Sequence, residues 1–265
     1  MHIKIGVIIN NLLAKEQETL YFAASELKKY LTKVTDCNIS IYTLSKARDD
    51  CLCITLADKR HELDDSINIK TEGFCGLIEG SNARSCLMGV YRYLSEHGFV
   101  FLRPSFDIIP ETFKVKNLDI SETASYRHRG FCIEGSVFYE SIEDLIDWLP
   151  KVYMNEYFIQ FEAPSCFFNR WYDGREKNAN TLSDEEVISM VKTLEREITK
   201  RGLIYQTMGH GWTCLPFNIP ATSWQELDES QCGHALPYVA ETDGKREFWH
   251  NQPINTNLCY SNPVV

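Results

Sequence analysis

Residues 126–212 alternate between strand-like and helix-like patterns, and this alternation limits the folds that the chain can adopt. Apolar runs at 130–133, 157–161 and 202–208 are separated by two segments whose apolar residues recur at helical spacing. The order strand, helix, strand, helix, strand predicts parallel strands joined by right-handed crossovers. In such sheets chemistry collects at the carboxyl ends of the strands. The residues that follow the three runs are Glu134, Glu162, His210 and Trp212.

The first half of the chain predicts a small mixed α/β domain over residues 1–122. Strand-like runs and two amphipathic helices are indicated by the spacing of apolar residues. The strands are expected at 3–9, 39–42, 51–56 and 76–80, and the helices at 15–33 and 81–98. Ser81 or Asn82 would cap the second helix and Gly98 would end it. The polar, strand-like segment 110–124 is interpreted as a connector to the second half.

The second half, residues 126–265, offers about three strand–helix steps. Its helices are expected at 142–153 and 183–201, and the latter opens on a capping box from Ser183 to Glu186. A long aromatic loop, which contains Trp171, precedes that helix. A closed eightfold barrel takes about 250 residues, which is more than this half contains. The half is therefore either a smaller open sheet or the first part of a longer barrel.

Charge and cysteine spacing narrow the possible partners. The net charge of −10 gives no attraction to a phosphate backbone, so we expect no nucleic-acid partner. The ten cysteines contain no CxxC pair and no zinc spacing, which predicts buried thiols, no metal and a reducing compartment. No glycine-rich phosphate loop follows a strand, and no cofactor is predicted. The run 3–9 is too short for a signal peptide or membrane span, so we expect a cytoplasmic protein without a membrane partner.

Several segments, taken in order along the chain, resemble a known group of enzymes. Segments of the first half resemble the non-catalytic α/β domain that precedes the barrel in α-glucuronidases and β-N-acetylhexosaminidases. These segments are 23–31 (AASELKKYL), 80–84 (GSNAR), 89–94 (GVYRYL) and 98–102 (GFVFL). Residues 126–134 are similar to the first barrel strand of those glycosidases and 201–210 to their third. The tail segments 243–246 and 257–263 resemble a group of glycosidase-like proteins.

The resemblance implies an accessory domain at 1–122 and the first part of a TIM-barrel domain at 126–265, with about the first half of a (β/α)8 barrel present. Two positions depart from the hexosaminidase pattern. Val137 stands where an arginine holds sugar hydroxyls, and Met208 stands where a proline precedes Gly-His. In those families the catalytic carboxylates come from strand four and beyond, so we expect the acid and base either to lie outside this chain or to be absent.

The candidate substrate-binding residues are Glu134, Glu162, His210, Trp212, Trp171 and Arg129. Glu134 either accepts a hydrogen bond from a sugar hydroxyl or pairs with Arg127 or Arg129. Glu134 and Glu162 are also candidates for a catalytic pair, for which glycosidases need a spacing of about 5–5.5 Å or about 6.5–9.5 Å. His210, between two glycines, could lie close to a ligand, and Trp212 and Trp171 could stack on a ring. Arg129 could equally be a structural charge at a strand terminus.

Two functions are compatible with these observations. The first is a carbohydrate-active glycoside hydrolase, or its N-terminal fragment, that acts on a glycoside or uronide and whose gene continues past Val265. The second is a glycan-binding protein that keeps the pocket without the catalytic carboxylates. A half barrel would leave open sheet edges and exposed apolar surface, so we expect dimerisation or aggregation of the chain alone.

Overall fold

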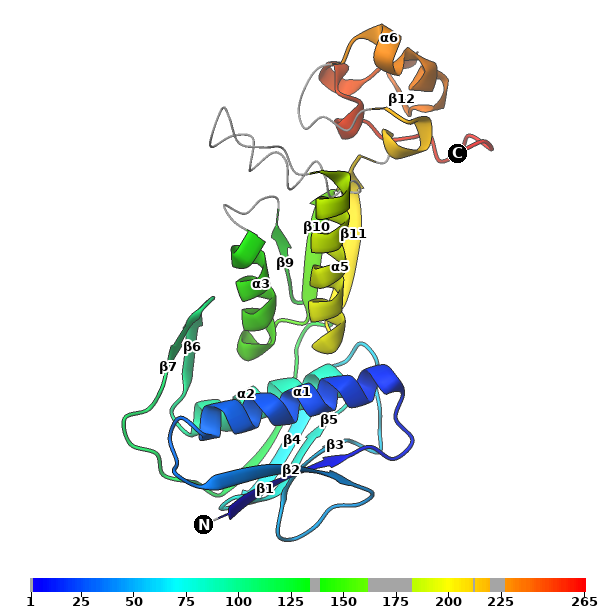
Figure 1. Ribbon diagram of the computed structural model, residues 1–265. Coiled ribbons are helices and arrows are strands. Elements are labelled where there is room, and N and C mark those ends of the chain that lie inside the picture. The colour runs from blue at the N-terminus through cyan, green and yellow to red at the C-terminus, as the bar shows by residue number, and fades with distance from the viewer. Residues whose placement is uncertain (1, 134–138, 162–182, 212, 220–226) are drawn as a thin grey trace. The chain divides into compact units, whose positions relative to one another are not determined.

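The computed structural model describes residues 2–133, 139–161, 183–211, 213–219 and 227–265 (Figure 1). The chain divides into two compact units, and each is interrupted in sequence. The first unit consists of Met1–Phe131, Glu140–Tyr157 and Leu194–Tyr205. The second consists of Cys132–Tyr139, Phe158–Thr193 and Gln206–Val265. The predicted domain boundary between residues 122 and 126 stays a prediction.

A six-stranded sheet in the order β2-β1-β3-β5-β4-β8 organises the first unit. Its strands are β1 (His2–Ile8), β2 (Asn38–Leu44), β3 (Leu52–Leu56), β4 (Ser66–Glu72), β5 (Cys75–Gly80) and β8 (Leu118–Thr123). The pairs β1–β2, β1–β3 and β3–β5 are parallel, whereas β4 is antiparallel to both β5 and β8. The four strands predicted from the sequence are confirmed, and the class is α/β.

One strand of this sheet, β4, was not predicted, and another, β8, falls in the segment that was predicted to be strand-like but was not assigned to a sheet. Strand β4 alternates buried and exposed residues, and its few apolar side chains gave only a weak pattern. Strand β8 lies inside the segment that was interpreted as a connector, and its Ile120 pairs with Ile69 of β4. The connector therefore supplies an edge strand to the first sheet. A separate hairpin, β6 (Val100–Arg103) with β7 (Phe106–Ile108), follows α2.

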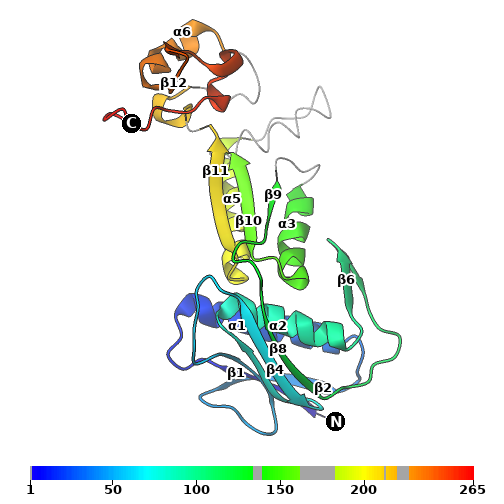
Figure 2. The same cartoon turned by 180° about the vertical axis from the view of Figure 1, so that it is seen from behind.

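Helices α1 (Ala14–Leu31) and α2 (Ala83–Glu96) lie side by side across one face of this sheet (Figure 2). Asn82 caps α2, because its side chain accepts a hydrogen bond from the Ser85 backbone N–H at 2.9 Å. Each fully buried Leu or Ile contributes about 1.5–3 kcal/mol, so the helix–sheet core accounts for much of the stability of the unit. Fully buried members of this core are Ile5, Leu20, Leu27, Ile54, Ile78, Leu87 and Val90.

A second sheet has the order β11-β10-β9, and its three arrows point the same way in both views (Figures 1 and 2). Its strands are β9 (Gly130–Ile133), β10 (Glu156–Phe161) and β11 (Ile204–His210). Helix α3 (Tyr139–Trp148), extended by the 3-10 turn η1 (Leu149–Val152), follows β9, and α5 (Asp184–Lys200) follows β10. The predicted strand–helix alternation is therefore confirmed. The capping box is also present, since Ser183 N donates to Glu186 Oε2 at 2.8 Å and Glu186 N donates to Ser183 Oγ at 3.3 Å.

The C-terminal region is built from short elements. These are η2 (Leu215–Phe217), α6 (Glu229–Cys232), η3 (Gly233–Tyr238), β12 (Glu241–Thr242), β13 (Lys245–Arg246), η4 (Trp249–Asn251) and η5 (Pro253–Asn255). Cys51, Cys53, Cys86 and Cys232 are buried thiols. Within the described ranges, none of the helices combines the length and the apolar character needed to cross a membrane.

Buried charges fix α3 and the end of α5 to the first unit. Asp147 of α3 accepts hydrogen bonds from Arg201 Nη2 at 2.6 Å, and it forms an ion pair with Lys151 Nζ at 2.7 Å. Lys151 also donates to Asp107 Oδ2 at 3.3 Å, and the Tyr30 hydroxyl donates to the same oxygen at 2.5 Å. Both cationic side chains are 6% exposed. Each buried charge therefore has an opposite charge beside it, which is the condition for burying it at acceptable cost.

This cluster predicts an acid-labile contribution to stability. Burial alone would raise the pKa of Asp147, but Lys151 and Arg201 outweigh it and lower the pKa from 3.8 to about 2. Because the folded pKa lies below the unfolded one, the stabilisation is present above about pH 4 and is lost as the pH falls towards 2. We expect Asp147→Asn to cost about 2 kcal/mol near neutral pH, and the difference from the wild type to shrink across that window.

The measurement is urea unfolding at a series of pH values, with the exposed Asp119 replaced in Asp119→Asn as the control. A wild-type-to-Asp147→Asn difference that stays constant from pH 5 to pH 2 would contradict the assignment of the low pKa to Asp147.

Candidate functional site

The three strands of the second sheet end beside one another. Strand β9 ends at Ile133, β10 at Phe161 and β11 at His210. Since the strands are neighbours and run the same way, these ends lie along one edge of the sheet. The candidates Glu134, Glu162, Trp171 and Trp212 lie outside the described residues. The substrate-binding roles of the candidates stay predictions.

His210 is the last residue of β11, and its backbone leads directly into a turn. Gly211 has φ of +104°, a conformation that favours glycine over any residue with a side chain. The Gly211 N–H donates to the Ile254 carbonyl at 3.0 Å. The end of β11 is thereby joined to the C-terminal region of the chain, and the backbone at His210 is held between the strand and this hydrogen bond.

Arg129 lies immediately before β9, at the start of the strand. Its side chain is 16% exposed and its guanidinium is engaged on several sides. Nε donates to the Tyr153 carbonyl at 2.8 Å and Nη1 to the Tyr126 carbonyl at 2.5 Å. Nη2 donates to Asp65 Oδ2 at 2.6 Å. These contacts fit the structural-charge interpretation of Arg129 that the sequence left open.

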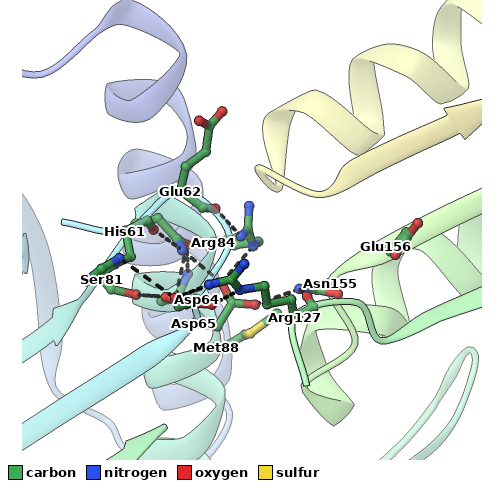
Figure 3. A network of polar contacts seen from close by, with 12 residues as sticks. His61, Glu62, Asp64, Asp65, Ser81, Arg84, Met88, Arg127, Asn155 and Glu156 are labelled. Atoms are coloured by element: carbon green, nitrogen blue, oxygen red, sulfur yellow. Dashed lines mark hydrogen bonds and ion pairs between the residues drawn. The ribbon is translucent and has the colours of Figure 1, made fainter. Parts of the chain in front are cut away.

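The partner of Arg129, Asp65, is the centre of a buried polar cluster, and Figure 3 shows Arg84 and Asn155 reaching it. Asp65 is 4% exposed. Its Oδ1 accepts from Arg84 Nε at 2.8 Å and from Asn82 Nδ2 at 2.8 Å, and its Oδ2 accepts from Asn155 Nδ2 at 2.8 Å. Burial would raise the pKa of Asp65, but the Arg84 charge and these hydrogen bonds lower it below its usual range. Asp65 is therefore ionised, and both of its carboxylate oxygens accept hydrogen bonds from other parts of the chain.

The same cluster fixes where β9 and β10 begin. Asn155, which is fully buried, precedes β10 and receives the Arg129 N–H on Oδ1 at 2.8 Å. The backbone of Asn155 also links the neighbouring strands, because its N–H donates to the Arg129 carbonyl and its carbonyl accepts from Ile204 N–H. Sequence reasoning missed Asp65 and Asn155, because no local motif marks either residue.

Two adjacent acidic residues, Asp228 and Glu229, follow Trp212 in the sequence. The sequence analysis did not identify this pair. Asp228 is the N-cap of α6, and its Oδ1 accepts from the Ser230 N–H at 2.8 Å. Hydrogen bonds from the side chain and the backbone of Ser230 lower the pKa of Asp228. Asp228 is thus accounted for by helix capping, a structural role that stabilises orphan backbone N–H groups, and Glu229 lies in the first turn of the same helix.

An open pocket of about 650 Å³ lies within the first unit and contains none of the six candidate residues. It is lined by the starts of α1 and α2, by the segment around His61 and by Gly202–Ile204. Arg84 is its most buried cation, and that side chain already pairs with Asp65. The most buried cation of this pocket is therefore already committed to the scaffold.

Comparisons with known proteins give a likeness in fold. No protein-family model matches the sequence, and no curated protein matches it. Among solved structures, an N-acetyl-β-hexosaminidase from Streptomyces plicatus matches 99% of this chain and 50% of its own, with a TM-score of 0.53 and 13% identity. A family 138 glycoside hydrolase that targets pectin rhamnogalacturonan II matches 78% of this chain and 25% of its own, with a TM-score of 0.52 and 14% identity.

A family 115 4-O-methyl-α-glucuronidase with specificity for decorated arabinogalactans matches 88% of this chain and 32% of its own, with a TM-score of 0.50 and 12% identity. The chain thus spans between a quarter and a half of the length of these three proteins. The resemblance to the hexosaminidase and glucuronidase group, predicted from the sequence, is confirmed at the level of fold. In its fold, the chain is similar to glycoside hydrolases.

Proposed function

We propose that this chain provides the accessory domain and the first part of a (β/α)8 barrel in a glycoside hydrolase that acts on a glycoside or a uronide. The observation that carries the proposal is the arrangement of β9, β10 and β11 as parallel neighbours with α3 and α5 between them in sequence. This is the unit from which (β/α)8 barrels are built, and such barrels bind their substrates at the carboxyl ends of the strands.

The proposed substrate-binding groups follow the ends of these strands. Glu134 and Glu162 would accept hydrogen bonds from sugar hydroxyls, since an ionised carboxylate offers only acceptors. His210 would contribute a ring nitrogen that can donate or accept. Trp212 and Trp171 would supply flat apolar faces for the sugar ring. The acid and base of hydrolysis would come from later strands of the barrel.

In this proposal Arg129 has a structural role. Its donors already serve Asp65 and two backbone carbonyls at the start of β9, away from the end of the strand. Withdrawing the guanidinium to bind a sugar would leave the buried Asp65 with less compensation. We therefore assign Arg129 to positioning β9 and not to contact with the sugar.

The alternative function is glycan binding without turnover. It is supported by the sequence departures from the hexosaminidase pattern at Val137 and Met208. The two functions share the same binding edge and differ in hydrolysis. Turnover of aryl glycosides or aryl uronides by the natural protein would favour the enzyme, and binding without turnover would favour the alternative.

The binding edge is tested by His210→Ala. We expect this variant to bind a sugar from a screen of glycosides and uronides roughly tenfold more weakly than the wild type, because one polar contact in a closed site is lost. Isothermal titration measures the affinity. His234→Ala is the matched control, since His234 is an exposed histidine of the same unit whose Nε2 lies 2.8 Å from the Phe217 carbonyl oxygen. Equal affinities for His210→Ala and the wild type, together with unchanged binding by Glu162→Ala, would remove the assignment.

Arg129→Ala separates positioning from binding. We expect it to destabilise the chain by about 3–5 kcal/mol, because it leaves the buried Asp65 carboxylate short of a partner. At a temperature where the variant is still folded, its affinity for the same sugar should match that of the wild type. Normal stability combined with lost sugar binding would instead make Arg129 a direct ligand.

A further inference from the structure

A pocket of about 500 Å³ lies in the C-terminal region of the second unit. Polar side chains surround one large aromatic ring in it. These lining residues are Thr242, Glu247, Trp249, Asn255, Thr256 and Asn257. A concave site with one apolar face and a few hydrogen-bonding groups is the usual form of a small-molecule site.

Trp249 is the apolar face of this pocket. Its side chain is 59% exposed, which is high for the largest of the apolar side chains. The backbone of this residue is nevertheless held in place, because the backbone N–H of Trp249 donates to Thr256 Oγ1 at 3.0 Å. The His250 ring packs against the indole at right angles, with the ring centroids 4.2 Å apart. A fixed indole with a free face is suited to stacking on a flat, partly apolar ring.

Asn255 forms part of the pocket wall and is only partly satisfied. Its Nδ2 donates to Gln252 Oε1 at 2.6 Å, whereas its Oδ1 is buried and has no hydrogen-bond partner among the described residues. A buried acceptor without a partner costs free energy, so its presence in a pocket wall points to a donor that arrives with a ligand. Thr242 and Asn257 add groups that can both donate and accept.

The pocket is joined to the end of β11. Ile254, which precedes Asn255, accepts a hydrogen bond from the Gly211 N–H at 3.0 Å, and the Thr213 hydroxyl donates to the Thr256 carbonyl. The segment that carries the pocket wall is therefore tied to the two residues that flank Trp212, next to His210. The pocket wall is thus anchored to the backbone that follows β11.

Charge selects among the sugars that could fit. Of the described residues that line the pocket, Glu247 is the only charged one, and it is an acid. The carboxylate of a uronic acid would meet a like charge here, whereas the hydroxyls of a neutral sugar could donate to Glu247 and Asn255.

We propose that this pocket is a subsite for a neutral pyranose ring, with Trp249 as the stacking surface and Glu247 and Asn255 as acceptors for sugar hydroxyls. The proposal rests on the carbohydrate function proposed above and narrows its substrate, because it places a neutral sugar unit next to the strand ends.

The test compares Trp249→Ala, Trp249→Phe and the control Tyr260→Ala, which removes another exposed ring of the same region. The probes are methyl β-D-glucopyranoside, N-acetylglucosamine and glucuronate, and binding is followed by calorimetry and by the indole N–H signals in NMR spectra. We expect Trp249→Ala to weaken binding of the neutral sugars roughly tenfold, and Trp249→Phe to keep most of the affinity. The Trp249 indole signal should shift on titration, and Glu247→Gln should narrow the preference for neutral sugars over glucuronate.

Unchanged affinity in Trp249→Ala, tighter binding of glucuronate than of the neutral sugars, or no binding of any probe would overturn the subsite. The wider function is judged separately. If His210→Ala loses binding while Trp249→Ala does not, the strand-end function stands and this subsite falls. If the Trp249 signal still responds with wild-type affinity in both His210→Ala and Glu162→Ala, the subsite stands and the strand-end function falls.

Discussion

The second sheet depends on one buried carboxylate, Asp65, at the start of its strands. Asp65 is joined to Arg84 at the beginning of α2, to Arg129 before β9 and to Asn155 before β10. Replacing such a cluster with apolar residues of the same volume can be neutral in free energy, so its value is not large net stability. What the cluster supplies is geometry, because the carboxylate is satisfied only when all three segments are in place. The starts of β9 and β10 are thereby held next to each other.

A second cluster, around Asp147, fixes the positions of α3 and of the end of α5. Arg201, at the end of α5, and Lys151, just after α3, both pair with this carboxylate. The segments that connect the strands are thus fixed in the same unit as the strand starts. Ligand-binding residues in such folds come from the other end of the strands, where side chains need not hold the scaffold together. The two ends of the strands have different roles because a charge that is buried and paired is not available to a ligand.

Sequence reasoning found the elements whose signal is local. The apolar spacing of α1 and α5, the Ser183 capping box and the runs that became β9, β10 and β11 were each contained within a short window. It missed β4, and it recognised the strand-like segment of β8 without its place in the sheet, because the burial of both strands depends on their neighbours there. It also missed Asp65, because the partners Arg129 and Asn155 lie 64 and 90 positions away in the sequence. The Trp249 pocket was also missed, because it brings together lining residues from β12, η4 and η5, which are separate in the sequence.

The central claim is that the carboxyl ends of β9, β10 and β11 form a carbohydrate-binding edge, while the starts of these strands serve the scaffold. Backbone amide chemical-shift mapping on a deuterated sample, titrated with the tightest-binding sugar, tests it most directly. The account predicts that the largest shifts fall at the residues that end and follow the three strands, including Gly211, and that the amides of Arg129 and Asn155 hardly move. Shifts concentrated in the six-stranded sheet, or centred on Arg129 and Asp65, would contradict it.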